Sequence, residues 1–192
     1  MGNNNGCRNT ERNADMLEGV QEELNRFGKY VVSQSRANLT RKDKNVSKDL
    51  WNSLKYDVEV HKNSFALTIQ MLEYGLFQDK GVRGKSSSTK APQSPYKFGS
   101  GRGKKGGLTK GIDKWVRARR FQFRDRDTGR FMSYKSTASL ITRSIYQKGI
   151  KPSLFFTKPF EKAFKNLNKD LLEAYKLDVE KFMSETINNK GI

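Results

Sequence analysis

The side chains best able to do chemistry in this chain are its cations, and they are gathered in one region. The 192 residues carry 38 Lys and Arg against 20 Asp and Glu, a formal net charge of +18. Residues 81–150 hold 18 of these cations and three carboxylates, a net +15, whereas the rest holds 20 cations and 17 carboxylates, a net +3. Such a concentration of one sign predicts an anionic neighbour: nucleic acid, an acidic protein surface, or both. A basic loop that serves solubility alone is the alternative.

The basic segment, residues 80–111, contains eight glycines, five serines, two prolines and no carboxylate. Such a composition buries too little apolar surface to offset its chain entropy, so it predicts a loop insertion that becomes ordered only when a partner holds it. The cations expected to contact that partner, protein or DNA, are Arg83, Lys85, Lys90, Lys97, Arg102, Lys104, Lys105, Arg117, Arg119 and Arg120.

Aromatic residues are interleaved with these cations at Tyr96, Phe98, Trp115, Phe121 and Phe123. Aromatic rings among Lys and Arg can stack on nucleic-acid bases or on guanidinium groups. They can equally be anchors of a core or an interface. The second interpretation is favoured, because Trp115 falls on the apolar face of a predicted helix.

The chain lacks the residue sets that catalysis usually needs. His61 is its only histidine and Cys7 its only cysteine, too few for a zinc set, and no Cys-His or Ser-His-Asp constellation is found around them. Two phosphate-loop look-alikes, at Gly84-Lys85-Ser86 and Gly103-Lys104, lack the required upstream glycine. We therefore predict no enzyme, no catalytic residue, no cofactor and no metal. A nuclease remains the enzymatic alternative, and it would require clustered carboxylates.

The run Asp125-Arg126-Asp127-Thr128-Gly129 begins like a calcium-binding loop. Its glycine comes one position early, and Ser136 stands where the bidentate glutamate belongs. A turn laced with Arg and Asp explains this run better.

The composition also bounds where the protein works. No apolar run approaches the roughly 20 residues that span a bilayer, so no membrane is expected. A lone cysteine fits a reducing, intracellular origin. The length predicts a single domain over residues 1–192, with residues 1–12 as a flexible polar arm.

Hydrophobic periodicity predicts the elements that position the cations. Apolar residues at three- and four-residue steps indicate an amphipathic helix over 16–36, and a short helix is expected at 48–54. Alternation over 56–60 and 65–71 around a polar turn at 62–63 predicts a β-hairpin. Residues 72–81 should form a short helix or a turn that closes this sheet.

The second half of the chain continues with a basic helix near 108–116 and an exposed hairpin around Thr128-Gly129. Ser136 or Thr137 should cap a helix that ends at Gly149, and residues 154–156 should form a third strand. A last amphipathic helix runs from Thr157 to about residue 186, roughly 44 Å at 1.5 Å per residue. That length exceeds what a small sheet covers, so one end should pack on another subunit.

Together these elements predict an α+β fold, in which a small antiparallel sheet is packed by the N-terminal helix and the long C-terminal helix. Their order resembles the tail-completion, or head–tail joining, neck proteins of tailed bacteriophages. The stretches that carry the resemblance are LEYGLFQDKG (72–81) and the passage 139–156, which ends in KGIKPSLFF. The basic segment and the DRDTGRF turn have no counterpart in this pattern.

The resemblance implies a structural protein of the virion neck that is assembled in the host cytoplasm. It implies a homo-oligomeric ring of six or twelve copies between the portal and the tail proteins, around the channel through which DNA passes. DNA in the lumen would be a further partner. The alternative is a basic nucleic-acid-binding module, associated with a ribosome or a nucleoid.

Overall fold

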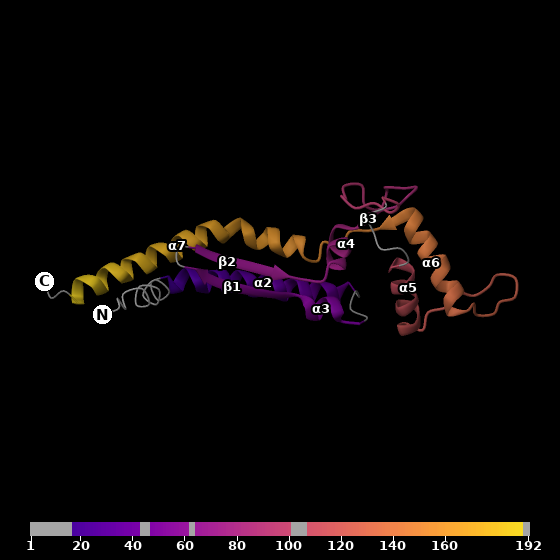
Figure 1. The fold of residues 1–192 in the computed structure, drawn as a ribbon, viewed down its shortest axis with the longest axis horizontal. Coiled ribbons are helices and arrows are strands. Elements are labelled where there is room, and N and C mark those ends of the chain that lie inside the picture. The colour runs from indigo at the N-terminus through magenta and orange to yellow at the C-terminus, as the bar shows by residue number, and fades with distance from the viewer. Residues whose placement is uncertain (1–16, 43–46, 62–63, 101–106, 190–192) are drawn as a thin grey trace, which may run out of the picture. The chain divides into compact units, whose positions relative to one another are not determined.

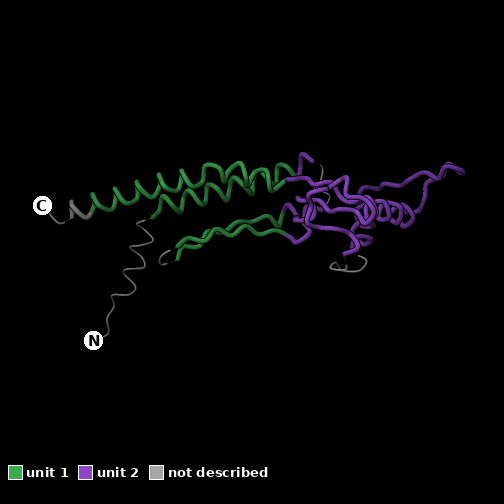
Figure 2. Tube along the Cα trace, turned by 90° about the horizontal axis from the view of Figure 1, so that it is seen from above, with its two compact units in different colours: residues 1–38, 52–71, 155–192 green, residues 39–51, 72–154 purple. Residues whose placement is uncertain are grey.

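The computed structural model of the chain describes residues 17–42, 47–61, 64–100 and 107–189. Its elements make an α+β protein with two small antiparallel sheets and a long C-terminal helix. The chain divides into two compact units, drawn green and purple in Figure 2: residues 1–38, 52–71 and 155–192 form unit 1, and residues 39–51 and 72–154 form unit 2. The expected arm at residues 1–12 lies outside the described residues.

Unit 1 contains a β-hairpin of β1 (Lys55–His61) and β2 (Ser64–Gln70), which pair in antiparallel register (Figure 1). Tyr56 lies opposite Ile69 and Val60 lies opposite Phe65. The alternation in the sequence predicted both strands, and the structure confirms them. Alternation places the apolar side chains on one face of the hairpin and the charged side chains on the other.

The helix α2 (Glu18–Arg41) buries the apolar stripe that predicted it, including Val31 and Val32. It extends five residues beyond the predicted end, because the stripe continues to Leu39, which is fully buried. Gly28 brings α2 close to the hairpin, since a Cβ there would lie 2.5 Å from the ring of Tyr56.

The C-terminal helix α7 (Thr157–Asn189) has 33 residues, or about 50 Å at 1.5 Å per residue. It runs antiparallel to α2 within unit 1 (Figures 1 and 2). Phe27 of α2 meets Phe160 of α7 edge to face, with ring centroids 5.7 Å apart. The prediction of a helix from Thr157 with Pro159 in its first turn is confirmed.

Unit 2 contains α4 (Tyr74–Lys80), β3 (Val82–Arg83), α5 (Gly107–Ala118), α6 (Tyr134–Lys148) and β4 (Gly149–Ile150). The strands β3 and β4 pair antiparallel. Hydrogen bonds from the amides of Ser153 and Leu154 to Gln78 and Asp79 also join the stretches 72–81 and 139–156, on which the resemblance rests. The short helix α3 (Asp49–Ser53) lies across the sequence boundary between the two units.

The N-cap of α6 lies three residues before Ser136, the earlier of the two predicted caps. This residue is Ser133, whose hydroxyl accepts a hydrogen bond from the amide of Ser136 at 3.0 Å. Gly149 ends the helix as predicted, with a φ of 84° that favours glycine.

The third strand predicted at residues 154–156 is wrong. The amides of Ser153 and Leu154 instead donate to the carbonyls of Gln78 and Asp79 at the end of α4. The last carbonyls of a helix have no partner within the helix, so this segment caps α4 rather than extending a sheet. The second hairpin is reduced to one bridge, between Arg124 and Phe131.

Candidate basic interface

The described part of the basic segment is folded into unit 2, which contradicts the expectation that it needs a partner to become ordered. The amide of Arg83 donates to the carbonyl of Tyr96 at 2.8 Å, and the amide of Phe98 donates back to Arg83 at 2.9 Å. The amide of Lys85 donates to the carbonyl of Tyr146 in α6 at 2.9 Å. The first two bonds join the two ends of residues 83–98 to each other, and the third attaches them to α6, which leads directly into β4.

Side chains close the same contact. The rings of Phe77 and Tyr96 meet edge to face at 4.7 Å, and those of Phe98 and Tyr146 meet at 5.7 Å. The hydroxyl of Ser94 is buried and donates to the carbonyl of Gly81 at 2.7 Å. The segment therefore has a small core of its own, which its glycine- and serine-rich composition did not predict.

Glycine serves close packing here rather than freedom of the chain. A Cβ on Gly84 would overlap the backbone carbonyl of Gln147, and one on Gly81 would lie 2.5 Å from the carbonyl of Ile150. Only glycine lets these backbones approach so closely. At these two positions, glycine permits close packing of the backbone and does not indicate disorder.

The cations predicted within the segment occupy different environments. The side chain of Arg83 is half-buried, and its Nε has no hydrogen-bond partner in the structure. Lys85 is exposed, with its Nζ 6.0 Å from the centre of the Tyr146 ring. Lys90 and Lys97 are exposed. Arg102, Lys104 and Lys105 lie outside the described residues.

The predicted arginines in the last turn of α5 and directly after it are exposed and lie close together in the sequence. Arg117 pairs with Asp113 one turn earlier, with Nε 2.9 Å from the carboxylate, and its guanidinium lies 5.7 Å from the centre of the Tyr134 ring. Arg119 and Arg120 follow directly, and Arg120 adopts a φ of 51°. Since an exposed ion pair is weak, Arg117 remains able to meet an anion.

An aromatic cluster of Trp115, Phe121 and Phe123 lies among these arginines. Ring centroids are 6.2 Å apart for Trp115 and Phe121 and 5.1 Å apart for Phe121 and Phe123. Each of the three side chains is about 40% exposed: 38%, 41% and 39%. The buried residue of α5 is Val116, so the aromatic cluster is a surface feature. Of the two anchor roles that the sequence favoured, core or interface, its exposure contradicts the first and leaves the second as a prediction.

The sequence analysis missed Phe131 and Arg124. Phe131 is 63% exposed, and the guanidinium of Arg124 lies 4.8 Å from the centre of its ring. A signal was present, because both residues flank the Thr128-Gly129 turn that the sequence predicted. Pairing across that turn brings them together.

The Asp125 turn holds its carboxylate with donors of its own chain. Oδ1 of Asp125 accepts from the amide and the hydroxyl of Thr128 at 2.9 and 3.0 Å and from the amide of Asp127 at 3.1 Å. These hydrogen bonds, chiefly the one from the Thr128 amide, hold the pKa of Asp125 below its ordinary value. Within the described ranges, no three His, Cys, Asp or Glu side chains are grouped as a metal ion would need.

Among the residues that the structure describes, one other group, the Tyr74 phenol, has a shifted pKa. Partial burial, together with the nearby carboxylate of Asp49, raises the pKa of Tyr74. Tyr74 lies on α4, outside the aromatic cluster, and its phenol stays neutral near pH 7.

Taken together, the exposed arginines and the aromatic cluster can bind an anionic partner through charge and through stacking. Comparison with protein-family models, with curated proteins and with solved structures found no match. In the part of the chain that the structure describes, none of the helices combines the length and the hydropathy that crossing a membrane requires.

Proposed function

We propose that this chain is a structural adaptor of a bacteriophage neck, a subunit of a ring of six or twelve copies that joins the portal to the tail around the DNA channel. The observation that carries the proposal is a row of apolar side chains on α7, called the α7 stripe: the exposed Leu172, Tyr175 and Met183 and the half-buried Val179. Leu172 and Met183 are each 57% exposed and Tyr175 is 51% exposed. Contiguous apolar surface of this kind marks a contact with another protein.

The cationic surface of unit 2 gives the adaptor a second, chemically different side. Exposed arginines near the aromatic cluster would meet acidic portal or tail subunits, or the phosphates of the DNA in the lumen. The role therefore uses folded surfaces, and it no longer needs a tether that becomes ordered on docking. The protein would be assembled in the host cytoplasm and would remain in the virion.

A phage that cannot produce this protein, examined by electron microscopy, tests the proposal. We expect DNA-filled heads without tails alongside free, complete tails, and purified chain added to this mixture should restore joined particles. Normal tailed virions without the chain would refute the adaptor function, as would its absence from purified virions by mass spectrometry.

A nucleic-acid-binding module is the second candidate, and the aromatic cluster favours it specifically. Base stacking on an aromatic ring contributes about 1–3 kcal/mol per base. Filter binding of a single-stranded oligonucleotide at several salt concentrations tests this function. Trp115→Ala or Phe121→Ala should weaken binding about tenfold, whereas Tyr74→Ala, which removes an aromatic ring that is 46% exposed on α4, should not. Equal effects of all three variants would refute stacking on the cluster.

A further inference from the structure

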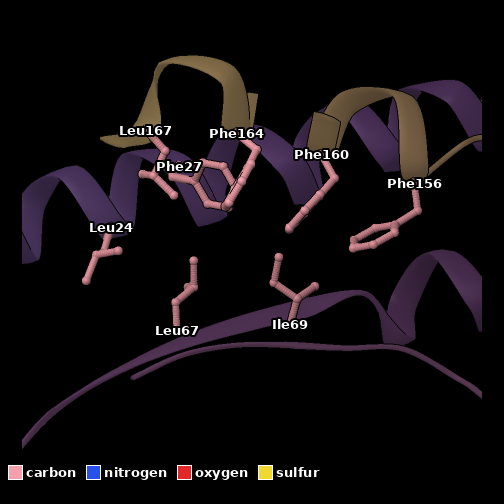
Figure 3. Close-up of a pocket in the computed structure, with 8 residues that line it drawn as sticks. All are labelled: Leu24, Phe27, Leu67, Ile69, Phe156, Phe160, Phe164 and Leu167. Atoms are coloured by element: carbon pink, nitrogen blue, oxygen red, sulfur yellow. The ribbon is translucent and has the colours of Figure 1, made fainter. Parts of the chain in front are cut away.

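Unit 1 contains an open apolar groove between α2, β2 and the first half of α7. Figure 3 shows side chains from all three elements pointing toward one another around it. The groove has a volume of about 280 Å³, and its walls include Leu24 and Phe27 of α2, Leu67 and Ile69 of β2, and Phe160 and Phe164 of α7. Its floor is well buried at Phe27, whereas Phe164 is 49% exposed. Apolar side chains from outside can therefore enter it.

The chain's own remaining segments do not suit this groove. The sixteen residues before the described part, MGNNNGCRNTERNADM, are mostly polar and have no run of apolar side chains. The groove is also smaller than the roughly 300–1,000 Å³ of a typical small-molecule site. Its chemistry fits a few apolar side chains presented by another protein surface.

The α7 stripe has the matching form. Its members recur at steps of three and four residues, so they lie along one side of the helix. The stripe spans Leu172 to Met183, and the groove wall made by α7 and the residue before it spans Phe156 to Leu167. Each is about 16 Å long at 1.5 Å per residue.

We propose that the α7 stripe of one copy docks into the groove of the next copy. Both surfaces lie on the same chain but on different parts of unit 1. Docking that repeats in one direction from copy to copy runs head to tail, the kind of contact that closes into rings. The three exposed stripe residues are each a little more than half exposed. A standard interface buries about 800 Å² per partner, so the surface of α7 that flanks the stripe also enters the contact. The inference deepens the proposed function, because it names the contact that would build the ring.

Two leucines of α7 provide a matched test. Leu172 is 57% exposed and belongs to the stripe, whereas Leu177 is 61% exposed and lies five residues on. Five residues turn the helix by roughly 140°, so Leu177 faces away from the stripe. We expect sedimentation velocity to show oligomers of the full chain, at least tenfold weaker association for Leu172→Glu, and no change for Leu177→Glu. Far-UV circular dichroism should be the same for all three.

Mixing two defective variants separates the groove from the stripe. Leu172→Glu retains its groove, and Phe164→Glu or Leu67→Trp blocks the groove but retains the stripe. Each variant alone should be monomeric, and a mixture should form one-to-one dimers that grow no further. A wild-type monomer at about 100 μM would overturn the inference. So would equal effects of the two leucine variants, or a mixture that stays monomeric, which would indicate stripe-to-stripe pairing.

These outcomes are independent of the neck function. Rings that depend on the groove but leave phage assembly unaffected would refute the function and retain the interface. If phage that carry the Leu172→Glu or the Phe164→Glu chain still form joined virions, the proposed interface would be refuted and the neck function retained.

Discussion

The carboxylate of Asp178 caps the N-terminus of α2 at Gly19. Its Oδ1 accepts from the amide of Gly19 and its Oδ2 from the amide of Val20, both at 3.1 Å. A Cβ on Gly19 would lie 2.7 Å from Oδ1, so glycine leaves room for the carboxylate. The first amides of a helix lack partners within it, and the helix dipole favours a negative charge there. One side chain of α7 therefore fixes where α2 begins.

Asp178→Ala should lower the free energy of unfolding by about 1 kcal/mol, the usual cost of losing an N-terminal cap. Asp178→Asn should lose less, because its amide oxygen still accepts one hydrogen bond. Urea denaturation followed by circular dichroism measures both. Asp170→Ala, on the same helix, controls for the loss of one negative charge. An equal loss in the control would show that charge, and not capping, is responsible.

Two glycine substitutions should have opposite effects. Gly84→Ala places a methyl group against the carbonyl of Gln147 and should destabilise unit 2 by about 1–3 kcal/mol, as overpacking does. Gly111→Ala, in α5 where no atom lies within 4 Å of the new Cβ, should stabilise by up to about 1 kcal/mol. Thermal unfolding of the two variants measures the difference. Similar melting temperatures would contradict the close contact at Gly84.

Amide hydrogen exchange should find the basic segment protected in the isolated chain. The amides of Arg83, Lys85 and Phe98 are hydrogen-bonded to backbone carbonyls, so they should exchange at least tenfold more slowly than an unstructured peptide of the same sequence. The peptide itself serves as the control. Exchange of all three amides at the peptide's rate would restore the interpretation of a partner-dependent loop.

Carbon-13 NMR should find the pKa of Asp125 below its ordinary value of 3.8. Because the folded state lowers this pKa, the turn's contribution to stability is present above the ordinary value and is lost as the pH falls through the folded one. Thr128→Val removes the hydroxyl donor and should raise the pKa in part, whereas Thr128→Ser should leave it low. No difference between these two variants would mean that the hydroxyl does not act on Asp125.

Much of the fold could be predicted from periodicity. The hairpin follows from alternation, and the long α7 follows from apolar residues at steps of three and four. The end of α6 at Gly149 follows from the preference for glycine where a helix ends with a positive φ. The prediction of a third strand at 154–156 is wrong because it considers only the apolar residues of that short stretch. Their backbone instead satisfies the end of α4, residues 74–80, a requirement that is visible only in three dimensions.

The candidate interface was predicted in charge but not in form. Counting cations located the basic region, and the structure exposes Lys90, Lys97 and Arg120. Composition could not distinguish glycine that loosens a chain from glycine that lets two backbones touch, as at Gly84. The partners of such contacts lie some 60 residues away in the sequence, at Gln147. A pattern confined to a short stretch of sequence does not reveal contacts between residues so far apart.

The hairpin of unit 1 also determines how the protein must be handled. Its β2 strand, SFALTIQ, has no charge, proline or glycine over seven residues, the profile of a segment that stacks into cross-β fibrils. Its partner β1 carries Lys55, Asp57 and Glu59, which oppose edge-to-edge stacking while the two strands stay paired. Solubility during purification and storage therefore depends on keeping this hairpin closed, and conditions that open it would invite precipitation before the rest of the chain unfolds.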